Sequence, residues 1–97
     1  MKLGNVIKEI RKKKNISQGD FADKLNISQA YLSQVESDKR TPSMDLLQNI
    51  SNHLGMPVFY FLFKGLEIDK DIPEDKRESY KQISPAISSL FEGFFIS

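Results

Sequence analysis

Four neighbouring positions carry side chains that can recognise the edges of DNA bases. A glutamine has a carbonyl and an amide NH₂, and together these match the N6 and N7 atoms that adenine presents in the major groove. Residues four apart are neighbours on a helix, which pairs Gln29 with Ser33 and Ala30 with Gln34. The alanine could also touch a thymine methyl group. The candidate base-reading residues are therefore Gln29, Ala30, Ser33 and Gln34.

Two short helices and a tight turn are predicted to position these side chains. Ser17 is expected to cap the first helix, with Asp20 at the capping-box position. Asn26 suits the turn, because asparagine tolerates a positive φ. Ser28 then caps the second helix, which runs to about Glu36. Two helices in this order form the helix-turn-helix geometry, in which the second helix enters the major groove of DNA.

Apolar residues at helical spacing predict the other helices of an all-α fold. A first helix precedes the pair, and Asn15 is expected to end it in a left-handed conformation. A fourth helix is expected between Ser43 as its cap and Gly55 as its end, and Pro57 opens a short fifth helix over 57–63. The inward-facing residues of the first and fourth helices are predicted to be Leu3, Val6, Ile7, Ile10, Met44, Leu47, Ile50 and Leu54.

The chain is expected to have three parts. Residues 1–63 form a five-helix domain, and 64–73 is interpreted as a linker because it combines turn residues with alternating charges. Residues 74–97 form a C-terminal helical segment for oligomerisation. A mostly polar helix is expected over 74–83 and a second helix, introduced by a proline, over 85–95.

Composition excludes several classes of protein. The 97 residues suffice for one small domain with an appendage, and 39% apolar and 28% charged residues are ordinary for a globular protein. With no cysteine and one histidine, we expect no metal and no cofactor. Because no nucleophile–base–acid set or glycine-rich phosphate loop can be assembled, we do not expect an enzyme. No apolar run reaches the roughly 18 residues of a membrane span, so a cytoplasmic protein with no membrane contact is expected.

Charge is distributed unevenly along the chain. Residues 1–40 hold nine basic and five acidic side chains, a net of +4, whereas 41–97 hold five and eight, a net of −3. This asymmetry suggests that one face binds a polyanion. Scatter in a lysine-rich chain explains it equally well on charge alone.

The segment 16–36 closely resembles the lambda repressor/Cro-like, or XRE-type, helix-turn-helix family. The resemblance covers about residues 3–63, roughly two-thirds of the chain. It implies a five-helix lambda repressor-like DNA-binding domain and a bacterial or phage-encoded, nucleoid-associated protein. The elements that carry it are Ser17-Gln18, Phe21-Ala22, the run from Leu32 to Glu36, Lys39-Arg40-Thr41-Pro42-Ser43 and Leu54-Gly55.

The resemblance also implies roles for individual residues. Base reading is assigned by it to Gln29, Ala30 and Gln34. Phosphate contacts are assigned to Gln18, Ser28, Lys39 and Arg40. The ring of Tyr31 either packs against the preceding helix or lays its hydroxyl on a phosphate. Arg11 and Glu36 resemble the family's partly buried ion pair, which is structural and ties the first helix to the recognition helix.

Aromatic residues are concentrated in the second half of the chain. The stretch 58–63 is apolar on all sides, so this helix must be covered. We expect the C-terminal segment to cover it and to form a homodimer, since several exposed phenylalanines favour association. Folding of 85–95 back onto the fifth helix within one chain is the alternative. The expected dimerisation residues are Phe59, Phe63, Ile87, Leu90, Phe91, Phe94 and Phe95.

Three functions are compatible with these features. The favoured one is a sequence-specific, double-stranded-DNA-binding transcriptional regulator, a repressor that reads a palindromic operator as a homodimer. An antitoxin or a restriction–modification controller protein uses the same kind of domain. In a third hypothesis, from another class, the chain is a protein-interaction module whose aromatic C-terminal segment binds a second protein.

Overall fold

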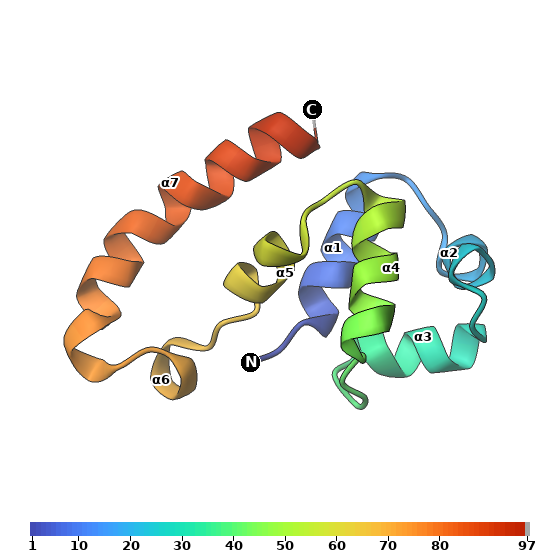
Figure 1. Ribbon diagram of the computed structural model, residues 1–97, viewed down its shortest axis with the longest axis horizontal. Coiled ribbons are helices and arrows are strands. Elements are labelled where there is room, and N and C mark those ends of the chain that lie inside the picture. Colours follow the sequence, from blue (N-terminus) through green and yellow to red (C-terminus); the bar gives the residue numbers. More distant parts are fainter. Residues whose placement is uncertain (97) are drawn as a thin grey trace.

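The computed structural model describes residues 1–96 and contains helices but no strand over that range (Figure 1). The all-α prediction is thereby confirmed. The elements in chain order are α1 (Gly4–Lys13), α2 (Gln18–Leu25), α3 (Gln29–Glu36), α4 (Met44–Leu54), α5 (Val58–Lys64), α6 (Ile68–Asp71), a 3₁₀ turn η1 (Glu74–Lys76) and α7 (Arg77–Phe95). The α2–α3 pair and α7 lie toward opposite ends of the molecule's 42 Å long axis.

Local capping determines where the first four helices begin and end. The hydroxyls of Ser17, Ser28 and Ser43 each accept a hydrogen bond from the backbone N–H three residues later, at 3.0–3.1 Å. Asn15 and Asn26 adopt the left-handed conformation, with φ of 59° and 58°. These are the caps and turns that the sequence predicts, and they satisfy backbone groups that a helix end leaves unpaired.

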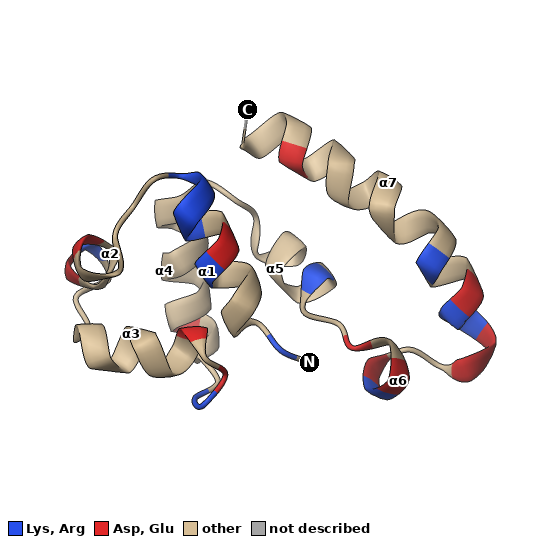
Figure 2. Ribbon diagram, turned by 180° about the vertical axis from the view of Figure 1, so that it is seen from behind, with Lys and Arg blue, Asp and Glu red and all other residues tan. Residues whose placement is uncertain are grey.

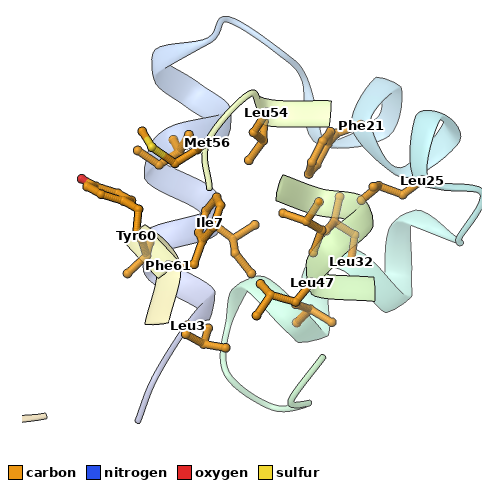
Figure 3. Packing of buried hydrophobic residues seen from close by; sticks show 14 of the residues in the cluster. Leu3, Ile7, Phe21, Leu25, Leu32, Leu47, Leu54, Met56, Tyr60 and Phe61 are labelled. Atoms are coloured by element: carbon orange, nitrogen blue, oxygen red, sulfur yellow. The ribbon is translucent and has the colours of Figure 1, made fainter. Parts of the chain in front are cut away.

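Helices α1 to α5 surround one hydrophobic core, which Figure 3 shows from close by. The predicted inward positions are buried, with one exception. Met44 is 62% exposed, because it is the first residue of α4 and lies beyond the reach of the neighbouring helices. The largest fully buried side chains are Tyr60, Phe21, Phe61, Ile7, Ile10, Leu32, Leu47, Ile50, Leu54, Met56 and Val35.

The start of α1 approaches the end of α3 unusually closely. A Cβ atom on Gly4 would lie 2.4 Å from the carbonyl oxygen of Val35 and 2.7 Å from that of Glu36. The N–H of Gly4 donates to Oδ1 of Asp38 at 2.8 Å. Asp38 has a φ of 62°, in the left-handed region that aspartate enters more readily than most residues. Only glycine fits at the start of α1. The carboxylate of Asp38, which follows α3, caps α1.

The linker and the C-terminal segment differ from the prediction. Within 64–73 the chain forms α6, whose Asp71 carboxylate lies 2.9 Å from the terminal nitrogen of Met1. The two helices expected over 74–83 and 85–95 are a single helix, α7, with Pro85 inside it. A proline inside a helix costs about 3 kcal/mol. Packing on α5 offsets this cost, because aromatic residues on both sides of Pro85 contact that helix.

These aromatic contacts fold α7 back onto α5 within the chain. Ring centroids lie 5.7 Å apart for Phe63 and Tyr80, and 5.8 Å apart for Tyr60 and Phe91. Phe95 stacks on Phe91, at 5.9 Å, and also packs against the core. Three residues expected at a dimer interface therefore take part in the fold-back within one chain, Phe63 from α5 and Phe91 and Phe95 from α7.

Polar contacts hold the end of α7 against α1. Nζ of Lys13 donates to Oε1 of Glu92 at 2.5 Å, and Nζ of Lys14 donates to the carbonyl oxygen of Phe95 at 2.7 Å. The hydrogen bond from Lys13 lowers the pKa of Glu92. Beside it, burial raises the pKa of Tyr60 to about 12, and the negative charge of Glu92 contributes. The basic end of α1 therefore binds the C-terminal helix.

Replacing Gly4 with alanine should destabilise the fold, because the new methyl group would push α1 away from the backbone of α3. Overpacking of this kind costs about 1–3 kcal/mol. The free energy of unfolding, measured by urea denaturation, should fall by at least that amount. The control is Gly93→Ala in α7, where a Cβ meets no atom within 4 Å. Because alanine favours a helix by about 1 kcal/mol over glycine, this control should be neutral or stabilising. Equal stability of the two variants would contradict the close approach.

Candidate nucleic-acid interface

The outer face of α3 presents the four candidate base-reading residues to solvent. Gln29, Ala30, Ser33 and Gln34 are all exposed, whereas Leu32, Val35 and Glu36 on the opposite face are buried. Figure 2 shows no lysine or arginine on α3, and basic residues in the loop that follows it. The four exposed side chains are themselves uncharged, so they can discriminate between partners through hydrogen bonds and shape.

Arg11 and Glu36 form a buried ion pair behind this face. Each residue is 5% exposed, and the guanidinium donates from Nε to Oε2 at 2.7 Å and from Nη2 to Oε1 at 3.0 Å. The remaining nitrogen, Nη1, donates to the carbonyl oxygen of Ile16 at 2.7 Å. The pair therefore joins the end of α1, the loop before α2 and the end of α3. This is the ion pair that the family resemblance implies, and both of its side chains are buried.

Hydrogen bonds extend from the ion pair to the first candidate base reader. Gln18 donates from Nε2 to Oε1 of Glu36 at 3.1 Å, and Gln29 donates from Nε2 to Oε1 of Gln18 at 3.3 Å. An arginine can only donate and an ionised carboxylate can only accept. The amide of Gln18 must therefore turn its NH₂ toward Glu36 and its oxygen toward Gln29. The ion pair thus determines which way the amide of Gln29 faces.

At the other end of α3, Arg40 lies against the recognition helix. Its Nε donates to Oε1 of Gln34 at 2.8 Å, and its guanidinium carbon lies 5.4 Å from the centroid of the Tyr31 ring. The ring itself is half-buried and packs against the core. Gln34 lies in α3 and Arg40 lies beyond its end, so helical periodicity does not predict that these two residues are neighbours. The sequence therefore gives no signal for this contact, and the phosphate role of Arg40 implied by the family resemblance stays a prediction.

The other residues assigned to phosphate differ in how free their side chains are. The hydroxyl of Ser28 already caps α3 by accepting from the N–H of Tyr31 at 3.0 Å, yet it keeps its own proton to donate. Gln18 uses one amide proton and keeps the other. The ammonium of Lys39 is exposed and makes no hydrogen bond or ion pair within residues 1–96. Of these three residues, Lys39 is the most available to an anion.

Residues 1–96 contain neither a membrane-spanning helix nor a cluster of metal ligands. No helix in that range is long and apolar enough to cross a membrane. No group of three or more His, Asp or Glu side chains within the same residues could hold a metal ion.

Comparison with known proteins identifies the same domain. A helix-turn-helix family model matches residues 7–61, more than half of the chain. The chain is 38% identical over 90 residues to the HTH-type transcriptional regulator ImmR of Bacillus subtilis (strain 168), covering 93% of the chain and 68% of the relative. It is 29% identical over 90 residues to the immunity repressor protein of Bacillus phage phi105, covering 93% of the chain and 62% of the relative.

A shorter relative matches over 68 residues. The chain is 37% identical over 68 residues to the control protein C.MunI of Mycoplasma sp, covering 69% of the chain and 90% of the relative. No solved structure gives a significant match. By contrast, the chain spans only about two-thirds of the length of ImmR and of the phage immunity repressor.

Glu36→Gln should destabilise the protein strongly, because it leaves the buried guanidinium of Arg11 without its counter-charge. Breaking a buried pair in this way costs about 3–5 kcal/mol. Urea denaturation measures the loss, and Glu78→Gln, at an exposed position in α7, is the matched control. The double variant Arg11→Met, Glu36→Leu should recover most of the stability, since it buries no unpaired charge. A Glu36→Gln protein as stable as the Glu78→Gln protein would contradict the structural role of the pair.

Proposed function

The chain belongs to the helix-turn-helix family, and on this premise we propose that it is a sequence-specific, double-stranded-DNA-binding transcriptional regulator. We further propose that it acts as a repressor, which excludes polymerase sterically from the operator it occupies. The names of two relatives, an immunity repressor and a transcriptional regulator, support this proposal. The match does not cover those relatives completely, so their full activities are not transferred to this chain.

One observation carries the proposal: the orientation of the Gln29 amide on an exposed, uncharged helix face. One of its amide protons is used by Gln18, which leaves its carbonyl oxygen and its second proton to meet a ligand. An acceptor beside a donor is the complement of the N6 and N7 edge of adenine in the major groove. Ala30 and Ser33, exposed beside it, would contact neighbouring base edges.

Positioning on the duplex would come from contacts to phosphates. Lys39 has a free ammonium, and the hydroxyl of Ser28 and the second amide proton of Gln18 can each donate to a phosphate oxygen. Such contacts carry no sequence information, but they determine the register of the recognition helix on DNA.

Homodimerisation through the outer face of α7 is the second part of the proposal. After the fold-back, four apolar residues of α7 remain on its outer side: Ile83, Ile87, Leu90 and Phe94. Leu90 is 72% and Phe94 78% exposed. Their spacing of four, three and four residues reads the same in both directions, so an antiparallel second copy would set Ile83 against Phe94 and Ile87 against Leu90. A two-fold interface is self-complementary in this sense.

The position of this face suits a DNA-binding dimer. It lies toward the end of the molecule opposite α3, so a second copy bound there leaves the recognition helix uncovered (Figure 1). Two recognition helices related by a two-fold axis can bind the two halves of a palindromic operator.

A restriction–modification controller protein remains a second candidate function. The observation in its favour is the match to a control protein over 90% of that relative's length. Both candidate functions would use the same α3 surface. The identity of the genes next to the gene for this chain would distinguish between them. The comparisons give no support to an interaction module without DNA binding.

Gln29→Ala should relax base preference at one position of each half-site, because the acceptor–donor pair that matches adenine is lost. We expect a loss of about 1–3 kcal/mol in discrimination there. Selection from a random duplex library at near-physiological salt measures this effect. Lys39→Ala is the control, since losing a phosphate contact should weaken binding to all sequences alike and reduce the salt dependence. Equal losses on operator and random DNA for Gln29→Ala would refute the base-reading role.

Leu90→Glu combined with Phe94→Glu should give a folded monomer with poor operator affinity, because like charges would replace the apolar contacts of α7. Sedimentation measures the mass, and circular dichroism checks that the helices persist. Lys81→Glu, on the same helix but outside the apolar face, should remain dimeric. A double variant that still sediments as a dimer would remove the outer face of α7 from the interface.

A further inference from the structure

Arg40 lies on the recognition surface itself. Two contacts hold it there: the hydrogen bond from its Nε to Oε1 of Gln34, at 2.8 Å, and the Tyr31 ring beneath its guanidinium, at 5.4 Å. The backbone N–H of Arg40 also donates to the carbonyl oxygen of Gln34 at 3.2 Å. The chain therefore turns back at the end of α3, and the guanidinium of Arg40 contacts Gln34 and Tyr31 of that helix.

This contact determines which atoms of Gln34 face outward. Because a guanidinium has donors and no acceptor, the amide oxygen of Gln34 must face Arg40 and its NH₂ must face away. The NH₂ makes no hydrogen bond within residues 1–96. Of the five guanidinium N–H groups, Nε–H is used, and those on Nη1 and Nη2 have no partner in the same range. The free groups of the two side chains are therefore all donors.

The two glutamines of α3 thus present different patterns. Gln29 keeps an acceptor and a donor, whereas Gln34 and Arg40 together present donors. In the major groove, guanine offers two acceptors, N7 and O6, while adenine offers the acceptor N7 next to the donor N6–H₂. A pair of donors satisfies both guanine atoms but opposes a donor on adenine. The pattern of Gln34 and Arg40 therefore complements a G·C pair and disfavours an A·T pair.

We propose that Arg40 and Gln34 act as one donor pair that selects guanine in each half-site, with the Tyr31 ring supporting the guanidinium. Arg40 is then a specificity-determining residue rather than a phosphate contact. This inference rests on the proposed function, since it requires α3 to enter the major groove. The base read by Gln29 lies at a different position of the half-site, because residues five apart on a helix point in directions that differ by about 140°.

Selection from the random duplex library tests the inference with four proteins: wild type, Arg40→Ala, Gln34→Ala and Lys39→Ala. The wild type should enrich guanine at one position of each half-site and adenine at another. Arg40→Ala and Gln34→Ala should both lose the guanine preference at the same position, by roughly 10- to 100-fold relative to adenine. The adenine preference should persist in both. Lys39→Ala, the matched control one residue away, should keep both preferences and bind every sequence more weakly.

A second measurement tests whether the two residues act together. Affinities for the operator with guanine and for the same operator with adenine at that position are measured for each single variant and for the double variant. If the two residues act together, the double variant should prefer guanine over adenine as much as either single variant does. The reason is that removing one donor already disorders the other. Independent, multiplicative losses of selectivity would overturn the pairing.

The results separate this inference from the function on which it rests. If Arg40→Ala lowers affinity for all sequences alike, as Lys39→Ala should, the inference is wrong while sequence-specific binding stands. If Gln34→Ala and Arg40→Ala alter different positions, the pairing is also wrong. If the wild type enriches no sequence at all, the proposed function fails and the inference fails with it. Thermal unfolding of each variant verifies that these exposed substitutions leave the fold intact.

Discussion

The buried ion pair of Arg11 and Glu36 is the interaction on which the recognition surface depends. It joins α1, the loop before α2 and the end of α3, and neither charge can remain in the core without the other. Because one partner only donates and the other only accepts, the pair also orients the amides of Gln18 and Gln29. Stability and recognition are thus linked through a single buried contact.

A steric constraint acts at the same junction. The backbones of α1 and α3 meet at Gly4, where any side chain would collide with the carbonyl of Val35. Asp38 caps α1 from the turn after α3, and the chain then returns so that Arg40 lies on the recognition helix. The loop that ends α3 therefore both fastens this helix to α1 and adds donors to its exposed face.

Helix α7 has two faces with different partners. Its inner face covers the aromatic fifth helix of its own chain, and Lys13 and Lys14, at the end of α1, hold its end. Its outer face is apolar and exposed, at the end of the molecule away from α3. The fold-back and the proposed dimer are therefore compatible rather than alternatives, because they use different faces of one helix.

The features that depend on near neighbours could be predicted from the residues alone. The serine caps, the left-handed turns at Asn15 and Asn26 and the exposed face of α3 follow from periodicity and from local hydrogen bonds, which act over a few residues. The family resemblance added the ion pair. Two features could not be predicted in this way: α7 continues through Pro85, and the amide of Gln34 faces Arg40. Both depend on where the chain returns in space, since packing on α5 offsets the cost of the proline and a turn of the loop brings the guanidinium onto α3.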